Sequence, residues 1–529
     1  MRPHRFALVV VLAGGSLIGC QDSEERAEVL PLTTAGSSSG GTGGAGARAV
    51  AAAGSRAAAG SGSGAAGNSA GSNAAAPKPD VVKVTVDSGT LVGESSGGVD
   101  VFRGVPFAKP PVGALRWKPP QKPDAWPGER AAVAFEPPCA QPTNLDGKTA
   151  NGGGVTGATS EDCLYLNVYA PAEAEKAPIV VWLHGGAFFL GAGSLGSYNG
   201  TSHAKQGVIT VSINYRLGSL GGFAHPALTK EAASDEWLGS YALMDAVAAL
   251  EWVQRNAAAF GGDANNVTLA GQSAGGVAVT HLLSVPRAKG LFHKAIIQSG
   301  SNTRPDAKLA DAETSGVETA KALGLTDATA EQLRSVSAQS LVTAYGALRA
   351  ASTPLNSFPI DDRFKTISTI DALNAGTEHD VPVLVGANSG ETGMDAARTI
   401  AKLAGDSGAG AWLYQFAYVP EFRRAEWTNG AIHSAELLFA FDTPDTSSWA
   451  VSATGKLDDE GRAVAKRVSS CWVAFYKMDP QAKSFSCADG FTWPAYTDAE
   501  DKAVRFEDVP KLVDSKSIPN GPPMPTGAP

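Results

Sequence analysis

Short apolar runs alternate with amphipathic stretches along most of this chain, and this alternation restricts the possible folds more than any other feature. The runs are continuous, as in strands buried on both faces: Ile179–Leu183, Val208–Ile213, Val267–Ala270, Ala295–Ile297 and Val381–Val385. Between two of them, Tyr241–Asn256 places its apolar side chains at helical spacing. Strands that alternate with helices predict an α/β protein with a mostly parallel sheet flanked by helices, in one large domain over residues 78–515.

The segments on either side of this domain have a different composition. Residues 1–20 contain Arg2 and Arg5 near their start, and a short apolar run follows. This pattern predicts a signal peptide for export rather than a membrane span. From Ala35 to Ala76, 36 of 42 residues are Ala, Gly or Ser. Such a sequence cannot build a core, so residues 21–77 are predicted to be a disordered tether. Residues 516–529, rich in Pro and Gly, are predicted to be a flexible tail.

The signal peptide ends in Leu17-Ile-Gly-Cys20, which resembles the lipobox of bacterial lipoproteins. In those proteins the cysteine is lipidated and becomes the mature N-terminus. The resemblance therefore implies lipidation of Cys20 and export as a membrane-anchored lipoprotein, on the periplasmic face of a membrane or at the cell surface. A simple secretory signal that is cleaved nearby is the alternative interpretation.

Four cysteines remain when Cys20 is set aside, and four cysteines allow three pairings. Pairing nearest neighbours joins Cys139 to Cys163 and Cys471 to Cys487, which closes two short loops in an exported and therefore oxidising setting. Four buried thiols are the alternative. No motif around any of the four favours a catalytic cysteine.

The segment Gly271-Gln-Ser-Ala-Gly275 follows one of the predicted strands and leads into an apolar stretch. A serine between glycines at a sharp turn from strand to helix is the nucleophile elbow, in which the hydroxyl is exposed above the sheet. A plain glycine-rich turn is the alternative. The strand, turn and helix context favours Ser273 as a catalytic nucleophile.

A serine hydroxyl needs a base, and the base needs an acid that orients it. Where this elbow occurs, the chain order is serine, acid, histidine. His281 and His293 lie just after the elbow, where roles in the core or at the surface are expected, and His433 is the only histidine beyond His379. Chain order therefore favours His433 as the base.

The acid is expected between Ser273 and His433, just beyond the end of a buried strand. Glu391 meets this condition, because it follows the run Val381–Val385 and a short turn. Asp395 lies one helical turn later and is the second candidate. A surface carboxylate without a catalytic role is the alternative for either residue.

Two backbone N–H groups are needed to bind the oxyanion that forms during acyl transfer. The glycines of His184-Gly-Gly-Ala-Phe188 follow a predicted strand, so Gly185 and Gly186, together with Ala274 after the nucleophile, are the predicted donors. Phe188 and Phe189 are predicted to line an apolar substrate pocket, or else to pack this loop. The nearby Gly191–Gly196 matches a dinucleotide-binding pattern, but no acidic residue or helix follows at the required spacing.

Charge excludes one broad class of partner. The formal net charge is −9 and the sequence contains no basic patch interleaved with aromatic residues, so nucleic-acid binding is not expected. The predicted partner is a small-molecule ester, and a membrane is contacted only through the lipid anchor. The chemistry of the predicted site calls for no metal or organic cofactor. The oligomeric state is left open.

Several motifs together resemble the type-B carboxylesterase/lipase family, the cholinesterase-like branch of the α/β-hydrolases. These motifs are Phe102–Gly113, Ser160–Tyr169, Phe260–Asp263 with Ser273–Gly275, and Trp493–Tyr496. The resemblance implies an α/β-hydrolase fold with Ser273 as nucleophile, Glu391 as acid and His433 as base, and it implies a disulfide between Cys139 and Cys163. It also implies a serine carboxylic-ester hydrolase that acts on short- to medium-chain esters through an acyl-enzyme. The alternative is a non-catalytic, cholinesterase-like surface binding module.

The sequence departs from the family pattern in two places. Asp361-Asp362 stands where the family usually has Asp-Gly, and Glu391 and His433 are only 42 residues apart, fewer than is usual in the family. A shorter connection predicts a more open site with a shifted range of substrates. It also requires that Trp412–Tyr418 still forms the strand before His433.

Overall fold

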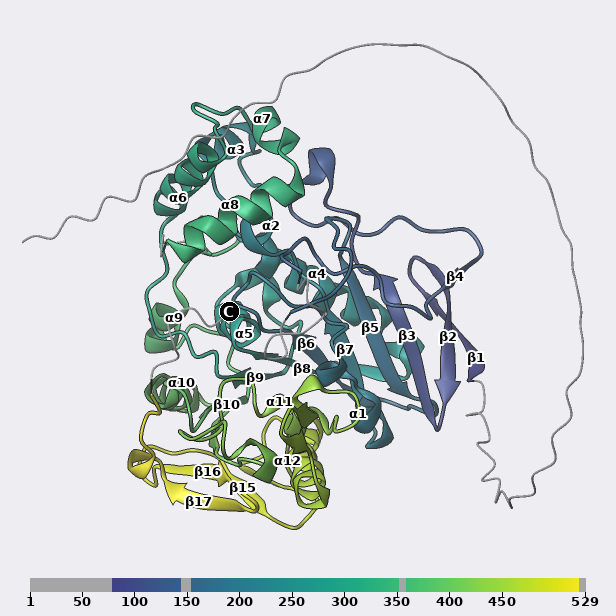
Figure 1. The fold of residues 1–529 in the computed structure, drawn as a ribbon, viewed down its shortest axis with the longest axis vertical. Helices are drawn as coiled ribbons and strands as arrows, with labels where there is room; N and C mark the ends of the chain where they lie inside the picture. The colour runs from purple at the N-terminus through teal and green to yellow at the C-terminus, as the bar shows by residue number, and fades with distance from the viewer. Residues whose placement is uncertain (1–78, 144–153, 352–357, 523–529) are drawn as a thin grey trace, which may run out of the picture. The chain divides into compact units, whose positions relative to one another are not determined.

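The computed structural model describes residues 79–143, 154–351 and 358–522 (Figure 1). The predicted signal peptide, the tether and Cys20 lie outside the described residues. Among the residues that are described, no helix is long and apolar enough to cross a membrane.

A large mixed sheet forms the centre of the described chain, and within it the seven strands from β7 to β16 run parallel. The strands before them in the pairing order, and the last strand, run antiparallel to their neighbours. The predicted α/β class with a mostly parallel sheet is thereby confirmed. In order of pairing the strands are β1 (Asp80–Val86), β2 (Gly89–Ser96), β3 (Val99–Pro106), β5 (Tyr165–Pro171), β7 (Ile209–Ile213), β6 (Ala177–Leu183), β8 (Gly262–Gln272), β9 (Lys294–Gln298), β10 (Val383–Asn388), β11 (Ala411–Phe416), β16 (Lys502–Phe506) and β17 (Pro510–Asp514), with β4 (Glu129–Ala131) beside β2.

Two small hairpins lie outside this sheet, β12 (Val451–Ser452) with β13 (Gly455–Lys456) and β14 (Ser484–Ser486) with β15 (Thr492–Pro494). The strand required before His433 is present as β11, which pairs with β10 along its whole length. Although the connection between the predicted acid and base is short, it still contains the strand that precedes the base.

Helices cover both faces of the sheet, and Figure 1 shows α3, α6, α7 and α8 grouped at one side of the molecule, far from β16 and β17. Their bounds are α1 (Thr201–Lys205), α2 (Gly218–Gly221), α3 (Pro226–Glu231), α4 (Tyr241–Asn256), α5 (Ala274–Leu282), α6 (Leu309–Ala322), α7 (Ala330–Ser335), α8 (Ala338–Ala350), α9 (Thr369–Ala375), α10 (Met394–Ser407), α11 (Leu437–Phe441) and α12 (Asp459–Lys477). The helix expected from the apolar spacing over residues 241–256 is α4.

The alternation of side chains along β6 explains why the core has two parts. Ile179, Val181 and Leu183 belong to the apolar cluster that contains the buried faces of α4, α5 and α10. Val180 and Trp182 point to the opposite side and join a second cluster with α11 and α12. A strand that is apolar at every position is thus buried on both faces, as parallel strands between two helical layers are.

The Asp361-Asp362 pair forms a tight turn. Asp362 has a φ of 58°, in the left-handed region that glycine favours and that aspartate tolerates better than most residues. The Asp361 carboxylate accepts hydrogen bonds from the backbone N–H groups of Phe364 and Lys365, each at 2.9 Å. An aspartate at position 362 is therefore accommodated in the conformation that glycine favours.

Both nearest-neighbour disulfides are present, Cys139–Cys163 and Cys471–Cys487, with sequence separations of 24 and 16 residues. The first is linked to the loop after β6, because Gln141 donates a hydrogen bond to the carbonyl of Gly191 at 2.8 Å and accepts one from its N–H at 2.7 Å. The second joins α12 to the segment that follows β14. Each bridge therefore ties a surface loop to an element of the core.

Removing either bridge should destabilise the fold. A disulfide that closes a loop of this length lowers the entropy of the unfolded chain, so the variants Cys139→Ala/Cys163→Ala and Cys471→Ala/Cys487→Ala should each lose about 3 kcal/mol in the free energy of unfolding. Urea unfolding followed by tryptophan fluorescence measures this loss. The wild-type protein in excess reductant, which breaks both bridges, is the comparison and should show a larger decrease in its midpoint than either variant.

Residues 516–522, assigned from the sequence to a flexible tail, pack against α10. Ile518 is 2% exposed, and the Arg398 guanidinium donates a hydrogen bond to the carbonyl of Ser515 at 2.8 Å. The side-chain oxygen of Asn520 accepts a hydrogen bond from the N–H of Asp395 at 3.2 Å, and the N–H of Gly521 donates to the carbonyl of Glu391 at 3.0 Å. This segment therefore reaches the loop that follows β10, and residues 523–529 lie outside the described chain.

Candidate active site

The predicted nucleophile lies on a sharp turn between β8 and α5. Ser273 has φ 55° and ψ −123°, a conformation that side-chain-bearing residues rarely adopt, and its N–H donates to the carbonyl of Gln298 at 2.8 Å. The turn is closely packed, since a Cβ on Gly275 would lie 2.0 Å from the carbonyl oxygen of Leu183. The sequence pattern with small residues around the serine thus follows from contact with β6.

The predicted acid and base form a hydrogen-bonded pair at the same edge of the sheet. Glu391 follows β10 by three residues, and His433 lies in the turn before α11. The Nδ1 atom of His433 donates a short hydrogen bond to Oε2 of Glu391, whose side chain is 2% exposed. Because parallel strands end at the same edge, residues that are distant in sequence meet here.

Two further donors hold the Glu391 carboxylate in place. Its Oε1 atom accepts a hydrogen bond from the N–H of Asn388 at 2.8 Å and another from the hydroxyl of Ser299 at 2.5 Å. Three donors, counting His433, thus surround this carboxylate, which suits the ionised form. Asp395, the second candidate for the acid, pairs instead with Arg398, and its side chain is 72% exposed.

The Nε2 atom of His433 lies 3.3 Å from the side-chain nitrogen of Gln272. With Nδ1–H donated to Glu391, Nε2 carries the lone pair and accepts from the amide of Gln272. This is the tautomer in which the ring takes up a proton at Nε2. Within the described ranges, no side chain is hydrogen-bonded to the hydroxyl of Ser273, and Nε2 of His433 lies against Gln272 instead.

A second buried carboxylate lies behind this pair. Glu436 is fully buried, and its carboxylate accepts hydrogen bonds from the amides of Asn388, at 2.5 Å, and Gln298, at 3.3 Å. Burial, reinforced by the negative charge of Glu391, raises the pKa of Glu436 to about 7. Burial lowers the pKa of His433, but the charge and hydrogen bond of Glu391, with a contribution from the Glu436 charge, outweigh burial and raise the pKa of His433 above its usual value.

Replacement of Glu436 by glutamine should shift the acid limb of the pH–activity profile to lower pH. If His433 is the base, it acts only when it is neutral, so activity should rise as the pH passes upward through its pKa. Because the pKa of Glu436 is about 7, its charge is present mainly above that pH. Removing this charge lowers the pKa of His433 there, and the ratio of kcat/KM at pH 7 to that at pH 9 should increase by up to about twofold. Initial rates with a nitrophenyl ester measure the ratio. Glu426→Gln, which removes an exposed carboxylate paired with Arg423, is the matched control, and an equal ratio in both variants would contradict the prediction.

The predicted oxyanion donors lie in a strained loop after β6. Gly186 has a φ of 112°, and a Cβ there would lie 2.0 Å from the carbonyl oxygen of Leu190, so only glycine fits. Gly185 lies close to the predicted nucleophile, because a Cβ on it would lie 3.2 Å from Cβ of Ser273. Ala274 begins α5, where backbone N–H groups have no partner within the helix. The loop brings Gly185 close to Ser273, and Ala274 follows Ser273 directly in the chain.

His184 holds this loop rather than taking part in proton transfer. Its ring is stacked on Tyr215 at 4.2 Å and lies 2.8 Å, through Nδ1, from the carbonyl of Gly185. Burial lowers the pKa of His184 to about 4, so the ring is neutral near pH 7 and Nδ1–H can donate to this carbonyl. Tyr215 in turn donates its hydroxyl hydrogen bond to the carbonyl of His184 at 2.5 Å.

A cavity of about 970 Å³ adjoins the site, and part of its wall is made of neighbours of the predicted catalytic residues. Val277 lies one helical turn after Ser273, Ser299 binds Glu391, and Thr392 follows Glu391. Ser273 and His433 themselves do not line it. The cavity is therefore a side chamber next to the reacting groups.

The two phenylalanines predicted to line the substrate pocket have different surroundings. Phe188 lines the cavity and packs edge to face against Phe358, with ring centroids 4.7 Å apart. Phe189 does not line it, because its ring packs on Tyr345 of α8 at 5.3 Å and lies under the guanidinium of Arg349. The position of Phe188 agrees with a role in the pocket, and that of Phe189 agrees with the alternative, packing of the loop. Ala187 and Phe188 both have a φ of 55°, so the backbone between the two rings is in the left-handed region.

Three polar residues of the site were not singled out from the sequence: Gln272, Ser299 and Glu436. Ser299 was accessible to the same reasoning that selected Glu391, since it stands directly after β9 at the edge where parallel strands end. Glu436 carries no such signal, because nothing in its local pattern shows that its carboxylate is buried. Among the described residues, no group of three or more His, Cys, Asp or Glu side chains could hold a metal ion.

Comparison with known proteins agrees with this geometry. Residues 80–405 match the model of the carboxylesterase family. Para-nitrobenzyl esterase of Bacillus subtilis is 34% identical over 471 residues, which cover 78% of this chain and 92% of that protein. Fumonisin B1 esterase of Sphingopyxis macrogoltabida is 41% identical over 324 residues, or 60% of this chain and 57% of that protein.

Solved structures show the same likeness. A PNB esterase structure superposes with a TM-score of 0.71 at 29% identity, covering 82% of this chain and 97% of that one. The carboxylesterase of Geobacillus stearothermophilus superposes with a TM-score of 0.68 at 30% identity, with the same coverage. The fold is that of the α/β-hydrolases. The chain belongs to the carboxylesterase family, as its motifs predicted, and it is a carboxylesterase.

Proposed function

We propose that this protein hydrolyses short- to medium-chain carboxylic esters through an acyl-enzyme on Ser273. The observation that carries the proposal is the His433–Glu391 hydrogen bond at the edge of the sheet where the nucleophile elbow stands. The apolar Phe188 ring in the adjoining cavity supports an acyl or alcohol group of modest length.

The reaction has two halves. Ser273 Oγ attacks the ester carbonyl carbon while Nε2 of His433 takes its proton, and Glu391 stabilises the imidazolium that forms. The N–H groups of Gly185, Gly186 and Ala274 bind the oxyanion. His433 then gives the proton to the leaving alcohol, which departs and leaves an ester on Ser273. Water attacks this acyl-enzyme with His433 as base, and the carboxylic acid is released.

Labelling with a fluorophosphonate and mapping of the modified peptide tests this mechanism without knowledge of the substrate. Modification is expected at Ser273 and should be lost in His433→Ala. His293→Ala is the control, because His293 receives a hydrogen bond from the N–H of Val267 and should leave labelling intact. Folded protein that is not labelled would instead support a non-catalytic surface binding module.

Export is a second part of the proposal. The Leu17-Ile-Gly-Cys20 motif supports lipidation of Cys20, and the Ala-, Gly- and Ser-rich segment after it suits a tether between a membrane and the catalytic domain. Membrane fractionation tests this: the wild-type protein should sediment with membranes, and Cys20→Ser should appear in the soluble fraction. Equal membrane association of both would contradict lipidation at this residue.

A further inference from the structure

The cavity beside the site has a polar wall that the ester chemistry does not use. It contains His281 and Arg304 together with two acids, Asp306 and Asp395. Both acids already have a cation, since Asp306 binds Lys365 at 2.6 Å and Asp395 pairs with Arg398. Arg304, by contrast, forms no ion pair with any residue in the described part of the chain.

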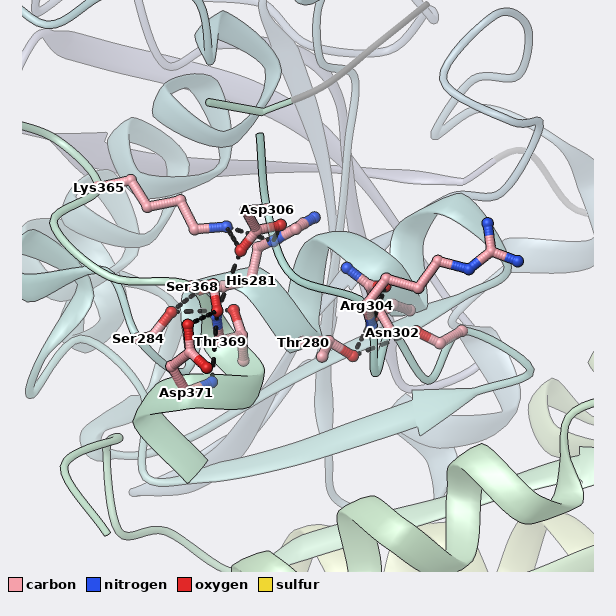
Figure 2. Close-up of polar contacts among 12 residues, drawn as sticks. Thr280, His281, Ser284, Asn302, Arg304, Asp306, Lys365, Ser368, Thr369 and Asp371 are labelled. Carbon is pink, nitrogen blue, oxygen red and sulfur yellow. Dashed lines mark hydrogen bonds and ion pairs between the residues drawn. The ribbon is translucent and has the colours of Figure 1, made fainter. Parts of the chain in front are cut away.

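A buried polar cluster fixes His281 in this wall (Figure 2). The Lys365 ammonium, which is fully buried, lies 2.6 Å from Nδ1 of His281 and 2.6 Å from Oδ2 of Asp306. The ring of Phe358 packs against the imidazole at 5.5 Å, nearly perpendicular to it. The imidazole can therefore neither rotate nor turn away from the cavity without breaking these contacts.

The same cluster determines which ring nitrogen of His281 carries the proton. An ammonium group donates hydrogen bonds and accepts none, so Nδ1 must be the acceptor and Nε2 must carry the hydrogen. Burial lowers the pKa of His281 well below its usual value, and the charge of Lys365 lowers it further, so the ring is neutral. Figure 2 shows the second ring nitrogen directed away from Lys365 and Asp306. No side chain in the described ranges accepts a hydrogen bond from it.

The cavity thus offers a fixed, neutral N–H donor at His281 and the guanidinium of the exposed Arg304, while each of its two acids is paired with a cation. Figure 2 shows Arg304 extending away from the His281 cluster, so the two groups reach different parts of the chamber. Donors without acceptors in a partly enclosed space favour a ligand that brings acceptors and negative charge. An aliphatic ester chain would leave both groups without a partner.

We propose that this cavity binds the part of an ester substrate that carries a free carboxylate, with Arg304 providing the charge and the Nε2–H of His281 a fixed hydrogen bond to a substrate oxygen. The inference rests on the proposed function, because the same substrate must present its ester carbonyl to Ser273. It makes His281 and Arg304 residues that determine specificity, and it names carboxylate-bearing esters as the preferred class.

Paired substrates of equal length test the proposal. Mono-(4-nitrophenyl) adipate carries a terminal carboxylate on the acyl side, and 4-nitrophenyl hexanoate is its neutral counterpart. A second pair, 4-carboxyphenyl butanoate and phenyl butanoate, places the carboxylate on the leaving group. The measured quantity is the ratio of kcat/KM for the charged ester to that for the neutral ester, in whichever pair the wild-type ratio is higher.

Arg304→Ala should lower this ratio by about tenfold, as expected for loss of a hydrogen bond to a charged group. His281→Leu should also lower it, whereas His281→Gln, which keeps a donor in the same place, should restore part of it. Arg287→Ala removes an exposed arginine of equal charge that pairs with Glu251 and is the matched control. Added salt should weaken hydrolysis of the charged ester more than that of the neutral one.

A wild-type preference for the neutral ester in both pairs would overturn the proposal, as would equal ratios in the wild type, Arg304→Ala and His281→Leu. These outcomes differ from failure of the proposed function. If Ser273 were not the nucleophile, neither ester would be hydrolysed and no fluorophosphonate label would be found. A hydrolysed neutral ester with an unchanged ratio rejects only the carboxylate site.

Discussion

Replacing Ser273 by alanine should lower kcat for 4-nitrophenyl butanoate by about 10⁵- to 10⁶-fold, the loss seen when the nucleophile of a comparable catalytic triad is removed. In the proposed mechanism this hydroxyl oxygen is the atom that becomes acylated, and among the described residues no other hydroxyl stands on the strained turn after β8. The rate is measured as the release of nitrophenolate, in a continuous or a stopped assay. Circular dichroism and the thermal midpoint should be unchanged, because the side chain makes no hydrogen bond within the described residues.

Ser299→Ala is the matched control for this variant. It also removes a serine hydroxyl next to the end of a parallel strand, but this hydroxyl only supports Glu391. Loss of one such hydrogen bond corresponds to about a tenfold decrease in kcat. A Ser273→Ala protein that kept activity comparable with that of Ser299→Ala would show that the elbow serine is not the nucleophile.

Glu391→Gln should lower kcat by about 10³- to 10⁴-fold while leaving KM nearly unchanged. The carboxylate accepts from Asn388, Ser299 and His433, and an amide of the same shape cannot accept from all three. With its oxygen held by Asn388 and Ser299, the amide would present N–H to Nδ1 of His433. The ring would then carry its proton on Nε2 and lose the ability to accept one from Ser273.

Asp395→Asn tests the second of the two residues that the sequence suggested as the catalytic acid. Its carboxylate is exposed and pairs with Arg398, so this variant should change kcat for a neutral ester by less than about threefold. Steady-state kinetics on both variants under one set of conditions gives the comparison. An equal loss in the two variants, or a loss below tenfold in Glu391→Gln, would remove Glu391 from the proposed role.

The sequence predicted the layers of the fold because parallel strands leave a simple pattern. A run such as Ile179–Leu183 is apolar at each position, and this is required where both faces are covered. The elbow was predictable for a similar reason, since the tight contact of Gly275 with β6 restricts the residue types around Ser273. Chain order then sufficed to select His433 from four histidines.

Features that depend on side-chain direction were not predictable in this way. Phe188 and Phe189 are adjacent and chemically identical, and only the left-handed backbone at Ala187 and Phe188 separates their environments. The same holds for Lys365, because lysines are seldom buried and nothing nearby in the sequence indicates that His281 and Asp306 meet it. Such contacts arise from the packing of distant segments, which local patterns do not record.

The hydrogen bond from Gly521 to the backbone of Glu391 has a consequence for the order in which the site is assembled during synthesis. The ribosome delivers the oxyanion loop and Ser273 early, the acid and base later, and residue 521 only after all of them. The strand β16, which pairs with β11, also emerges after His433. A growing chain thus carries a nucleophile without a fully supported base until nearly all of the domain has been made. During synthesis, the backbone contact between Gly521 and Glu391 is therefore the last of these supporting contacts to become available.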